Sequence, residues 1–279
     1  MWQDYKSLVA QHTVVGDLRV YKNFYSPQLD NYRDLLAWLP PSYATSDKRY
    51  PVIYMHDGDN LFDAHVSYSG EWMVDETITE LAKEGLEAIV VGIPNMNEMR
   101  RIEYNPYPTH VGEIFWDGRG DDYIRFIAET IKPFIDAEFR TDPRPEKTGI
   151  AGSSMGGLIS LHGFLTRADV FGLCGSFSPV FWTGVDEIIR IRAQGDGRIY
   201  MDMGGKEGEV IMGIATNMAS NLEEAHAVYL NGVRQLRDDL VAGGYVLGQS
   251  LLYVEDSEAL HHESAWAQRL PDALRFLLK

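Results

Sequence analysis

Hydrophobic and polar positions along the chain follow two alternating patterns, one typical of buried strands and one typical of amphipathic helices. The apolar run 86–94 predicts a strand buried on both faces of a parallel sheet. Apolar residues at helical spacing, with acidic residues early and Gly85 as a stop, predict a helix over 72–84. The whole pattern predicts strands at 18–25, 34–40, 50–55, 86–94, 147–151, 173–177, 198–203 and 245–254, and helices at 72–84, 121–139, 158–165, 185–193, 217–242 and 263–278.

The order of these elements predicts the fold class. Two leading strands are followed by strands that alternate with helices, which favours an α/β protein, a three-layer α/β/α sandwich with a mostly parallel sheet. Residues 95–120, rich in Pro, Tyr, Trp and charge, are expected to form a long loop that sets specificity. Because no linker, repeat or low-complexity tract divides the chain, we expect one domain over residues 1–279.

The strongest candidate for chemistry is a G-x-S-x-G pattern, Gly152-Ser153-Ser154-Met155-Gly156, between a predicted strand and a predicted helix. A sharp turn there would expose the Ser154 hydroxyl at the end of the sheet, which predicts a nucleophile. Both glycines are expected to be needed, because a Cβ at either position would collide with the neighbouring strand or helix. The alternative is a small-residue packing turn that arises by chance in a chain with 26 glycines.

A serine nucleophile needs a histidine as general base. His261 and His262 follow the last predicted strand and precede the C-terminal helix, where a loop can return to the serine. Both remain candidates on position alone. Three other histidines are better explained by core packing or exposure to solvent than by a catalytic role, and these are His12, His162 and His226.

The base in turn needs an orienting carboxylate, and the chain order on this architecture is serine, acid, histidine. Glu207 lies in a Gly-rich loop just past a strand end and is the first candidate. Asp202 lies inside that strand, so we expect it to be structural. Glu255 and Asp256 end the final strand and are the alternatives.

The oxyanion of ester hydrolysis needs two backbone N–H donors. We expect one from Met155, directly after the serine, and one from Asp59 in the loop after the third strand. Gly58 would let this backbone approach the substrate, whereas a plain Asp-Gly turn is the alternative. His56 beside this loop has no second ligand cluster of metal-site spacing, so no metal and no cofactor are predicted.

Composition narrows the possible partners. With 25 Lys+Arg against 41 Asp+Glu, the formal net charge is −16, which disfavours nucleic acid and anionic membranes. Cys174 is the only cysteine and is expected to be a buried structural thiol. Because no apolar stretch is long enough to span a bilayer and no signal-peptide pattern opens the sequence, we expect a cytoplasmic protein. The oligomeric state stays open.

With these residues in place, the chain resembles, over about residues 17–278, a family of α/β-hydrolases. The family includes esterase D, enterochelin, feruloyl and acetyl-xylan esterases, and mycolyltransferases. The motifs that carry the resemblance are Val52–Gly58, Arg101–Pro106, Gly152–Gly157, Ser178–Trp182, Asp202–Gly208, His261–Trp266 and Arg269–Pro271. Together they occur in the order that the family has.

The resemblance implies an α/β-hydrolase fold and a serine esterase with Ser154 as nucleophile, Glu207 as acid and His261 as base. The family often has His-Asn-Glu at the last motif, where this chain has His262 in the middle position. Candidate substrate-binding residues are Gly58, Arg101, Tyr104 and Trp182. The aromatic residues among them are equally compatible with a purely structural place in the core.

The expected activity is hydrolysis of a small-molecule carboxylic ester through an acyl-serine intermediate. Two alternatives stay open, acyl transfer to an alcohol on the same scaffold and a catalytically inactive binding module. The natural ester, whether a simple acyl, feruloyl, acetyl-sugar or siderophore ester, is not readable from these residues.

Overall fold

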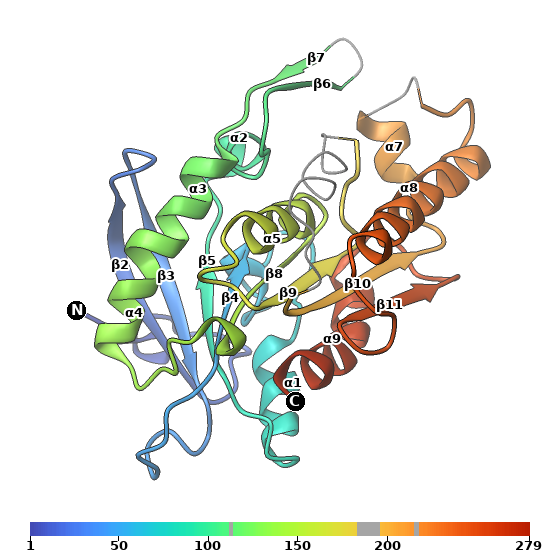
Figure 1. Cartoon of the computed structure of the whole chain (residues 1–279). Coiled ribbons are helices and arrows are strands. Elements are labelled where there is room, and N and C mark those ends of the chain that lie inside the picture. Colours follow the sequence, from blue (N-terminus) through green and yellow to red (C-terminus); the bar gives the residue numbers. More distant parts are fainter. Residues whose placement is uncertain (112–113, 183–195, 215–217) are drawn as a thin grey trace.

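The computed structural model describes residues 1–111, 114–182, 196–214 and 218–279 (Figure 1). Its strands are β1 (Gln3–Asp4), β2 (Asp17–Ser26), β3 (Asn31–Leu39), β4 (Val52–His56), β5 (Ile89–Ile93), β6 (Thr109–Val111), β7 (Ile114–Trp116), β8 (Thr148–Ser153), β9 (Leu173–Phe177), β10 (Arg198–Gly204) and β11 (Leu251–Asp256). Its α-helices are α1 (Val74–Ala82), α2 (Arg100–Glu103), α3 (Gly120–Phe126), α4 (Lys132–Glu138), α5 (Met155–Thr166), α7 (Glu209–Ile214), α8 (Leu222–Ala242) and α9 (Glu263–Leu278).

The main sheet has the strand order β1-β2-β3-β5-β4-β8-β9-β10-β11. The strands from β5 to β11 in this order pair in parallel, whereas β1, β2 and β3 add an antiparallel edge. This confirms the predicted mostly parallel sheet. Because the parallel strands all end at one edge, the loops after β4, β8 and β10 meet there.

Helices cover both faces of this sheet, so the predicted three layers are present (Figure 1). Leu35 and Ala37 of β3 belong to the core that also contains apolar residues of α3, α5 and α8. Leu36 and Trp38 of the same strand belong to the core that contains residues of α1 and α9. This alternation follows from the two-residue period of a strand, whose successive side chains point to opposite faces.

Several bounds differ from the sequence-based ones for local reasons. Helix α8 begins at Leu222 because the Asn221 side chain accepts a hydrogen bond from the Glu224 N–H and caps the helix. Residues 245–250 form a turn, with Gly248 at φ 76°, so β11 begins only at Leu251. The predicted helix at 185–193 lies outside the described residues.

Other differences concern elements that the sequence pattern did not predict. The expected loop 95–120 contains α2 and the hairpin of β6 and β7. Helix α7 follows the Gly-rich loop directly. A π-helical turn (Ile127–Ile131) joins α3 to α4 within the predicted helix 121–139. No helix in the described ranges is long and apolar enough to cross a membrane.

Candidate active site

Ser154 occupies a strained turn between β8 and α5, as the G-x-S-x-G pattern predicts. Its φ of 58° and ψ of −121° are a conformation that residues with a side chain rarely adopt. The turn is held on both sides, because the Ser154 N–H donates to the Phe177 carbonyl at 2.9 Å and the Ser154 carbonyl accepts from the Leu158 N–H at 3.1 Å. Such a turn presents the hydroxyl at the carboxyl end of the sheet.

The glycines around Ser154 differ in how much space their surroundings leave for a side chain. A Cβ at Gly152 would lie 2.8 Å from His56 Cδ2, so a side chain is excluded there. A Cβ at Gly156 would meet nothing closer than 3.5 Å outside its own helix, so the expected collision at this position is wrong. Gly157 is the tight position instead, because a Cβ there would lie 2.9 Å from the Phe177 carbonyl oxygen.

Ser154 and His261 line one cavity of about 280 Å³. It lies at the sheet edge where the loops after the parallel strands meet. Most of the residues that line it carry polar side chains, although polar and apolar atoms share its surface about equally. The residues that line it are Asp57, Asn60, Tyr68, Ser69, Asn95, Arg100, Ser153, Ser154, His261, Glu263 and Trp266.

Glu207 and His261 form a close pair beside this cavity. His261 Nδ1 lies 2.6 Å from Glu207 Oε2, and the Glu207 side chain is fully buried. The edge of the His261 ring packs on Trp266, with ring centroids 5.0 Å apart. Because the carboxylate accepts the Nδ1 proton, the other ring nitrogen is left as the acceptor that a general base needs.

His262 has a different place although it is adjacent in sequence. It is exposed and caps α9, where its Nδ1 accepts a hydrogen bond from the Ser264 N–H at 3.2 Å. The alternative acids also lie elsewhere. Glu255 is held by Arg234 at the surface, and Asp256 accepts from the Glu258 N–H.

Behind Glu207 lies a buried polar network that sequence reasoning did not find. Glu207 Oε1 accepts hydrogen bonds from the Ser178 hydroxyl and the Gly204 N–H, both at 2.7 Å. The Ser178 oxygen in turn accepts from Trp266 Nε1 at 3.0 Å and Arg269 Nη2 at 3.1 Å. This network leaves the carboxylate of Glu207 one orientation toward His261.

Asp202 anchors the same network, in the structural place expected for it. Arg269 Nε and the Tyr200 hydroxyl donate to it, each at 2.8 Å, and the Ser178 N–H donates at 2.9 Å. Burial raises the pKa of Asp202 to about 6, although Arg269 and Tyr200 both act to lower it. Arg269 stands in one of the motifs found in the sequence without a role, and the signal for a buried role is its apolar position between Trp266 and Leu270 on a helix.

The loop after β4 forms the facing wall of the cavity. Asp57, at φ 55°, receives two hydrogen bonds from Arg100 at 2.7 and 2.8 Å and one from Asn95 at 2.8 Å. Burial would raise the pKa of Asp57, but Arg100 and Asn95 outweigh it and hold this pKa below its ordinary value. Tyr104 supports the loop from below, since its hydroxyl accepts from the Asp57 N–H at 3.2 Å.

The two predicted oxyanion donors have unequal positions. Met155 is the first residue of α5, so its N–H has no partner within the helix and points out of the helix start. Asp59 is exposed and is not among the residues that line the cavity, although Asp57 and Asn60 on either side are. Gly58 packs against β5, where a Cβ would lie 2.7 Å from the Pro94 nitrogen.

The remaining predicted substrate residues lie outside the cavity lining. Arg101 is exposed, and its guanidinium lies 5.1 Å from the centre of the Trp116 ring in a neighbouring groove, whereas Arg100 is the arginine at the cavity. Tyr104 is fully buried. Trp182 is half-buried and packs on Phe181 and Tyr229.

His56, the histidine considered as a metal ligand, is fully enclosed below the site. Its Nδ1 lies 2.9 Å from the Tyr123 hydroxyl. Burial lowers the pKa of His56 to about 3, so the ring is neutral at ordinary pH. His56 therefore acts as packing beneath the serine turn. Cys174, also fully buried, confirms the expectation of a structural thiol.

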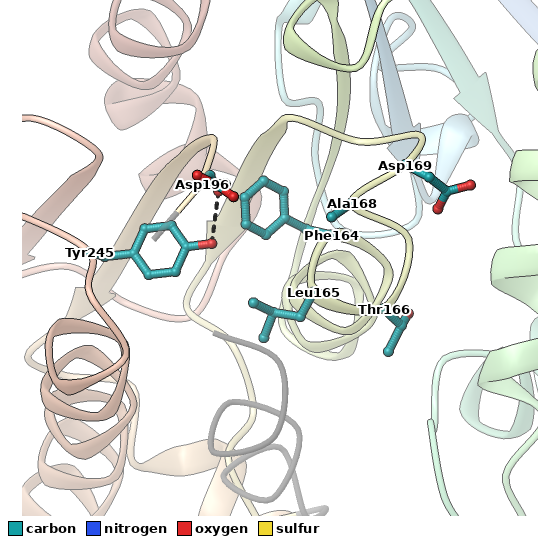
Figure 2. A pocket seen from close by; sticks show the side chains of 7 residues that line it. All are labelled: Phe164, Leu165, Thr166, Ala168, Asp169, Asp196 and Tyr245. Atoms are coloured by element: carbon teal, nitrogen blue, oxygen red, sulfur yellow. Dashed lines mark hydrogen bonds between the residues drawn. The ribbon is translucent and has the colours of Figure 1, made fainter. Parts of the chain in front are cut away.

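A second cavity, of about 270 Å³, lies at the opposite end of α5 (Figure 2). Because α5 has 12 residues, its ends are about 18 Å apart. Phe164, Leu165 and Tyr245 form its apolar wall, and the Tyr245 hydroxyl donates to the Asp196 carbonyl at 3.0 Å. It holds none of Ser154, Glu207 and His261.

Comparison with known proteins agrees with this geometry. Residues 26–277 match the model of the family described as "Putative esterase". An uncharacterised protein of Bacillus subtilis (strain 168), YbbA, is 28% identical over 251 residues, which cover 88% of this chain and 92% of that protein.

Solved structures share the fold. The BES protein from Bacillus cereus has a TM-score of 0.69 and 22% identity, with 96% of this chain and 97% of that chain covered. The siderophore hydrolase EstA from Aspergillus nidulans has a TM-score of 0.69 and 17% identity over 94% and 95% of the two chains. The chain belongs to the esterase family whose model it matches, and it is a carboxylic ester hydrolase.

Proposed function

We propose that this chain hydrolyses carboxylic esters through an acyl-enzyme formed on Ser154, with His261 as general base and Glu207 as its orienting acid. The observation that carries the proposal is the 2.6 Å contact between His261 Nδ1 and Glu207 Oε2, beside a cavity that His261 shares with the strained Ser154 turn. The His261–Glu207 pair and the Ser154 turn, which come from distant parts of the sequence, are the residue types that a triad requires, and this supports the proposal.

In the first half of the reaction the Ser154 oxygen attacks the ester carbonyl carbon while its proton passes to His261 Nε2. The tetrahedral intermediate collapses, the bond to the leaving oxygen breaks, and the alcohol takes the proton from His261. Water then repeats the sequence on the acyl-serine, releasing the acid and restoring the hydroxyl. Glu207 keeps the His261 ring in the required tautomer and offsets its positive charge.

The oxyanion is stabilised by the Met155 N–H at the start of α5 and by a second N–H from the loop after β4, for which Asp59 is the proposed donor. Each such donor contributes about 3 kcal/mol to lowering the barrier. The position of Asn60 and Asp57 on the cavity wall supports a donor from this loop.

The cavity wall favours a polar ester. The Asp57–Arg100 ion pair, Asn60 and the buried Glu263 offer hydrogen bonds to hydroxyl or amide groups, and the cavity of about 280 Å³ leaves little room for a long acyl chain. A siderophore ester, the class that the name of EstA gives, is one such substrate, and an acetylated sugar is another.

Replacement of the proposed nucleophile tests the mechanism. In Ser154→Ala, the kcat for p-nitrophenyl acetate should fall by at least about 10³-fold, and labelling by a fluorophosphonate should disappear. Ser160→Ala is the matched control, since Ser160 lies on the same helix and its hydroxyl only donates to the Gly156 carbonyl. The wild type should also prefer the acetyl ester to the decanoyl ester.

Retained turnover or labelling in Ser154→Ala, with Ser160→Ala equal to wild type, would contradict Ser154 as nucleophile. Loss of activity in both variants with altered circular dichroism would point to a folding defect. In that case the rate at which a fluorophosphonate labels a folded Glu207→Gln variant tests the proposed triad instead. Slow labelling is the expected result, and labelling at the wild-type rate would contradict the triad.

A further inference from the structure

Three carboxylates gather at the start of α1, outside the proposed catalytic machinery. Glu71 lies three residues before the helix, and Asp75 and Glu76 lie in its first turn. Each side chain offers one oxygen, and these three oxygens all lie within 4.8 Å of one another. Among the described residues this is the one group of metal-ligating side chains arranged in this way.

Asp75 is buried, Glu71 and Glu76 are half-buried, and all three carboxylates are incompletely paired. Asp75 has no exposed surface; its Oδ2 accepts from the Val15 N–H at 2.6 Å, no donor group among the described residues reaches its Oδ1, and its carboxyl lies close enough to that of Glu76 to share a proton. Glu71 Oε2 accepts from the Thr13 hydroxyl at 3.1 Å. Glu71 Oε1 and Glu76 Oε2 are buried oxygens that also have no partner within the described ranges.

No Lys, Arg or His in the described part of the chain forms an ion pair within 4.0 Å with any of the three. The N-terminus of α1 provides some compensation, since a helix start carries about half a positive charge. Three carboxylates carry about three negative charges when ionised. The helix therefore leaves most of the negative charge unbalanced, and burial makes that imbalance costly.

We propose that Glu71, Asp75 and Glu76 bind a Ca²⁺ ion. Carboxylate oxygens are the ligands that Ca²⁺ prefers, at about 2.3–2.6 Å, so two of them on one ion can be up to about 5 Å apart. The observed spacing fits this limit. The free oxygens are buried, but Glu71 and Glu76 are half-buried as residues, so water from the edge of the group completes the coordination.

The site would connect α1 to the wall of the catalytic cavity. Tyr68 and Ser69, just before Glu71, line that cavity, and the Trp72 N–H donates to the Asn60 carbonyl at 2.8 Å. Met73, between Glu71 and the helix, has a φ of 54°. A cation here would hold this tight turn in place, independently of whether the proposed triad is correct.

The test uses the full chain freed of metal by a chelator and then titrated with CaCl₂, with calorimetry and thermal melting as readouts. Ca²⁺ should bind with near 1:1 stoichiometry and raise the melting midpoint by about 5 °C at a concentration a hundredfold above Kd. Glu71→Gln and Glu76→Gln should each weaken binding by about 10-fold or more. Glu80→Gln is the control, because Glu80 is exposed on the same helix and pairs with Lys83.

Three results would overturn the proposal. In the first, Ca²⁺ gives no binding heat and no change in the melting midpoint, and Glu76→Gln melts at a higher temperature than wild type. This combination would mean that the carboxylates share protons with one another and do not bind a cation. Another is an equal shift with NaCl at matched ionic strength, which would indicate screening. A response to Mg²⁺ as large as that to Ca²⁺ would overturn the choice of calcium.

Discussion

The two ends of α5 carry cavities of nearly equal volume, about 280 Å³ beside Ser154 and about 270 Å³ beside Tyr245. At the first, side chains from the loop after β4, the Ser154 turn and the start of α9 converge, and polar groups on its wall pair with one another, as Asp57 does with Arg100 and Asn60 with Glu263. At the second, whose lining residues Figure 2 shows, the carboxylates of Asp169 and Asp196 belong to exposed residues. Asp169 is already paired with Arg167.

The comparison shows that volume alone does not identify a site. A site differs from a packing void in having buried polar groups that converge on one point and are held by further hydrogen bonds. The end of α5 that has the helix N-terminus and the strained Ser154 turn meets this condition. The other end has polar and apolar lining in similar amounts, but its two carboxylates, Asp169 and Asp196, are exposed and do not converge on a buried point.

The largest expected effect comes from removing the cation behind Glu207, the proposed acid. Arg269→Met leaves Asp202 and Glu207 buried without their shared guanidinium, so the free energy of unfolding should fall by about 3–5 kcal/mol. In the folded fraction, kcat/KM should also fall. Its pH profile should move to higher pH, because removal of Arg269 raises the pKa of the buried Asp202 further above its ordinary value. Denaturant unfolding and the pH profile measure the two effects.

Arg275→Met is the matched control for this prediction. Arg275 lies on the same helix but is exposed and pairs with Glu84 at the surface. It should melt close to wild type and keep the wild-type pH profile. An Arg269→Met protein with an unshifted profile would show that Arg269 is structural only and does not position Glu207.

A medium effect is expected at the facing wall. Arg100→Gln removes the ion pair that holds Asp57, so the loop with the proposed oxyanion donor should loosen and kcat should fall by about 10-fold. The same change should also raise the pKa of Asp57 toward its ordinary value. A depressed carboxyl pKa contributes stability that is lost as pH falls through it, so Arg100→Gln should lose less stability on acidification than wild type.

Arg101→Gln provides the neighbouring control, because Arg101 is exposed and packs on Trp116 outside the cavity. Steady-state kinetics should leave it within about twofold of wild type. If Arg101→Gln lost activity and Arg100→Gln did not, the assignment of Arg100 to the site would be reversed.

The smallest effect is predicted at the second cavity. A substitution there tests the comparison between the two cavities most directly. Ala168 lines the second cavity and Ser69 lines the cavity beside Ser154, and both are small exposed residues. Ala168→Trp should leave kcat/KM within about twofold of wild type, whereas Ser69→Trp should lower it several-fold by obstructing the substrate. Similar losses in both variants would mean that the two cavities act together.

Much of the fold was predictable because its signals are local. The apolar run of β5, the two-residue alternation in β3 and the turn around Ser154 each act within about ten residues of chain. Capping and turn residues were harder to read. Asn221 and Gly248 moved the start of α8 and β11 by several residues, because one polar or glycine residue overrides a weak periodic pattern.

The amino-acid sequence by itself determined the serine turn, the alternation of strands and helices, and the short set of histidines and acids that follow it. Only the tertiary structure decided that His261 rather than His262 meets Glu207, that Arg100 rather than Arg101 reaches the cavity, and that Arg269 stands behind the acid. Neighbouring residues on a helix or in a loop point in different directions. Which of them reaches a site depends on how distant strands pair, and strand order is set by packing across the whole sheet.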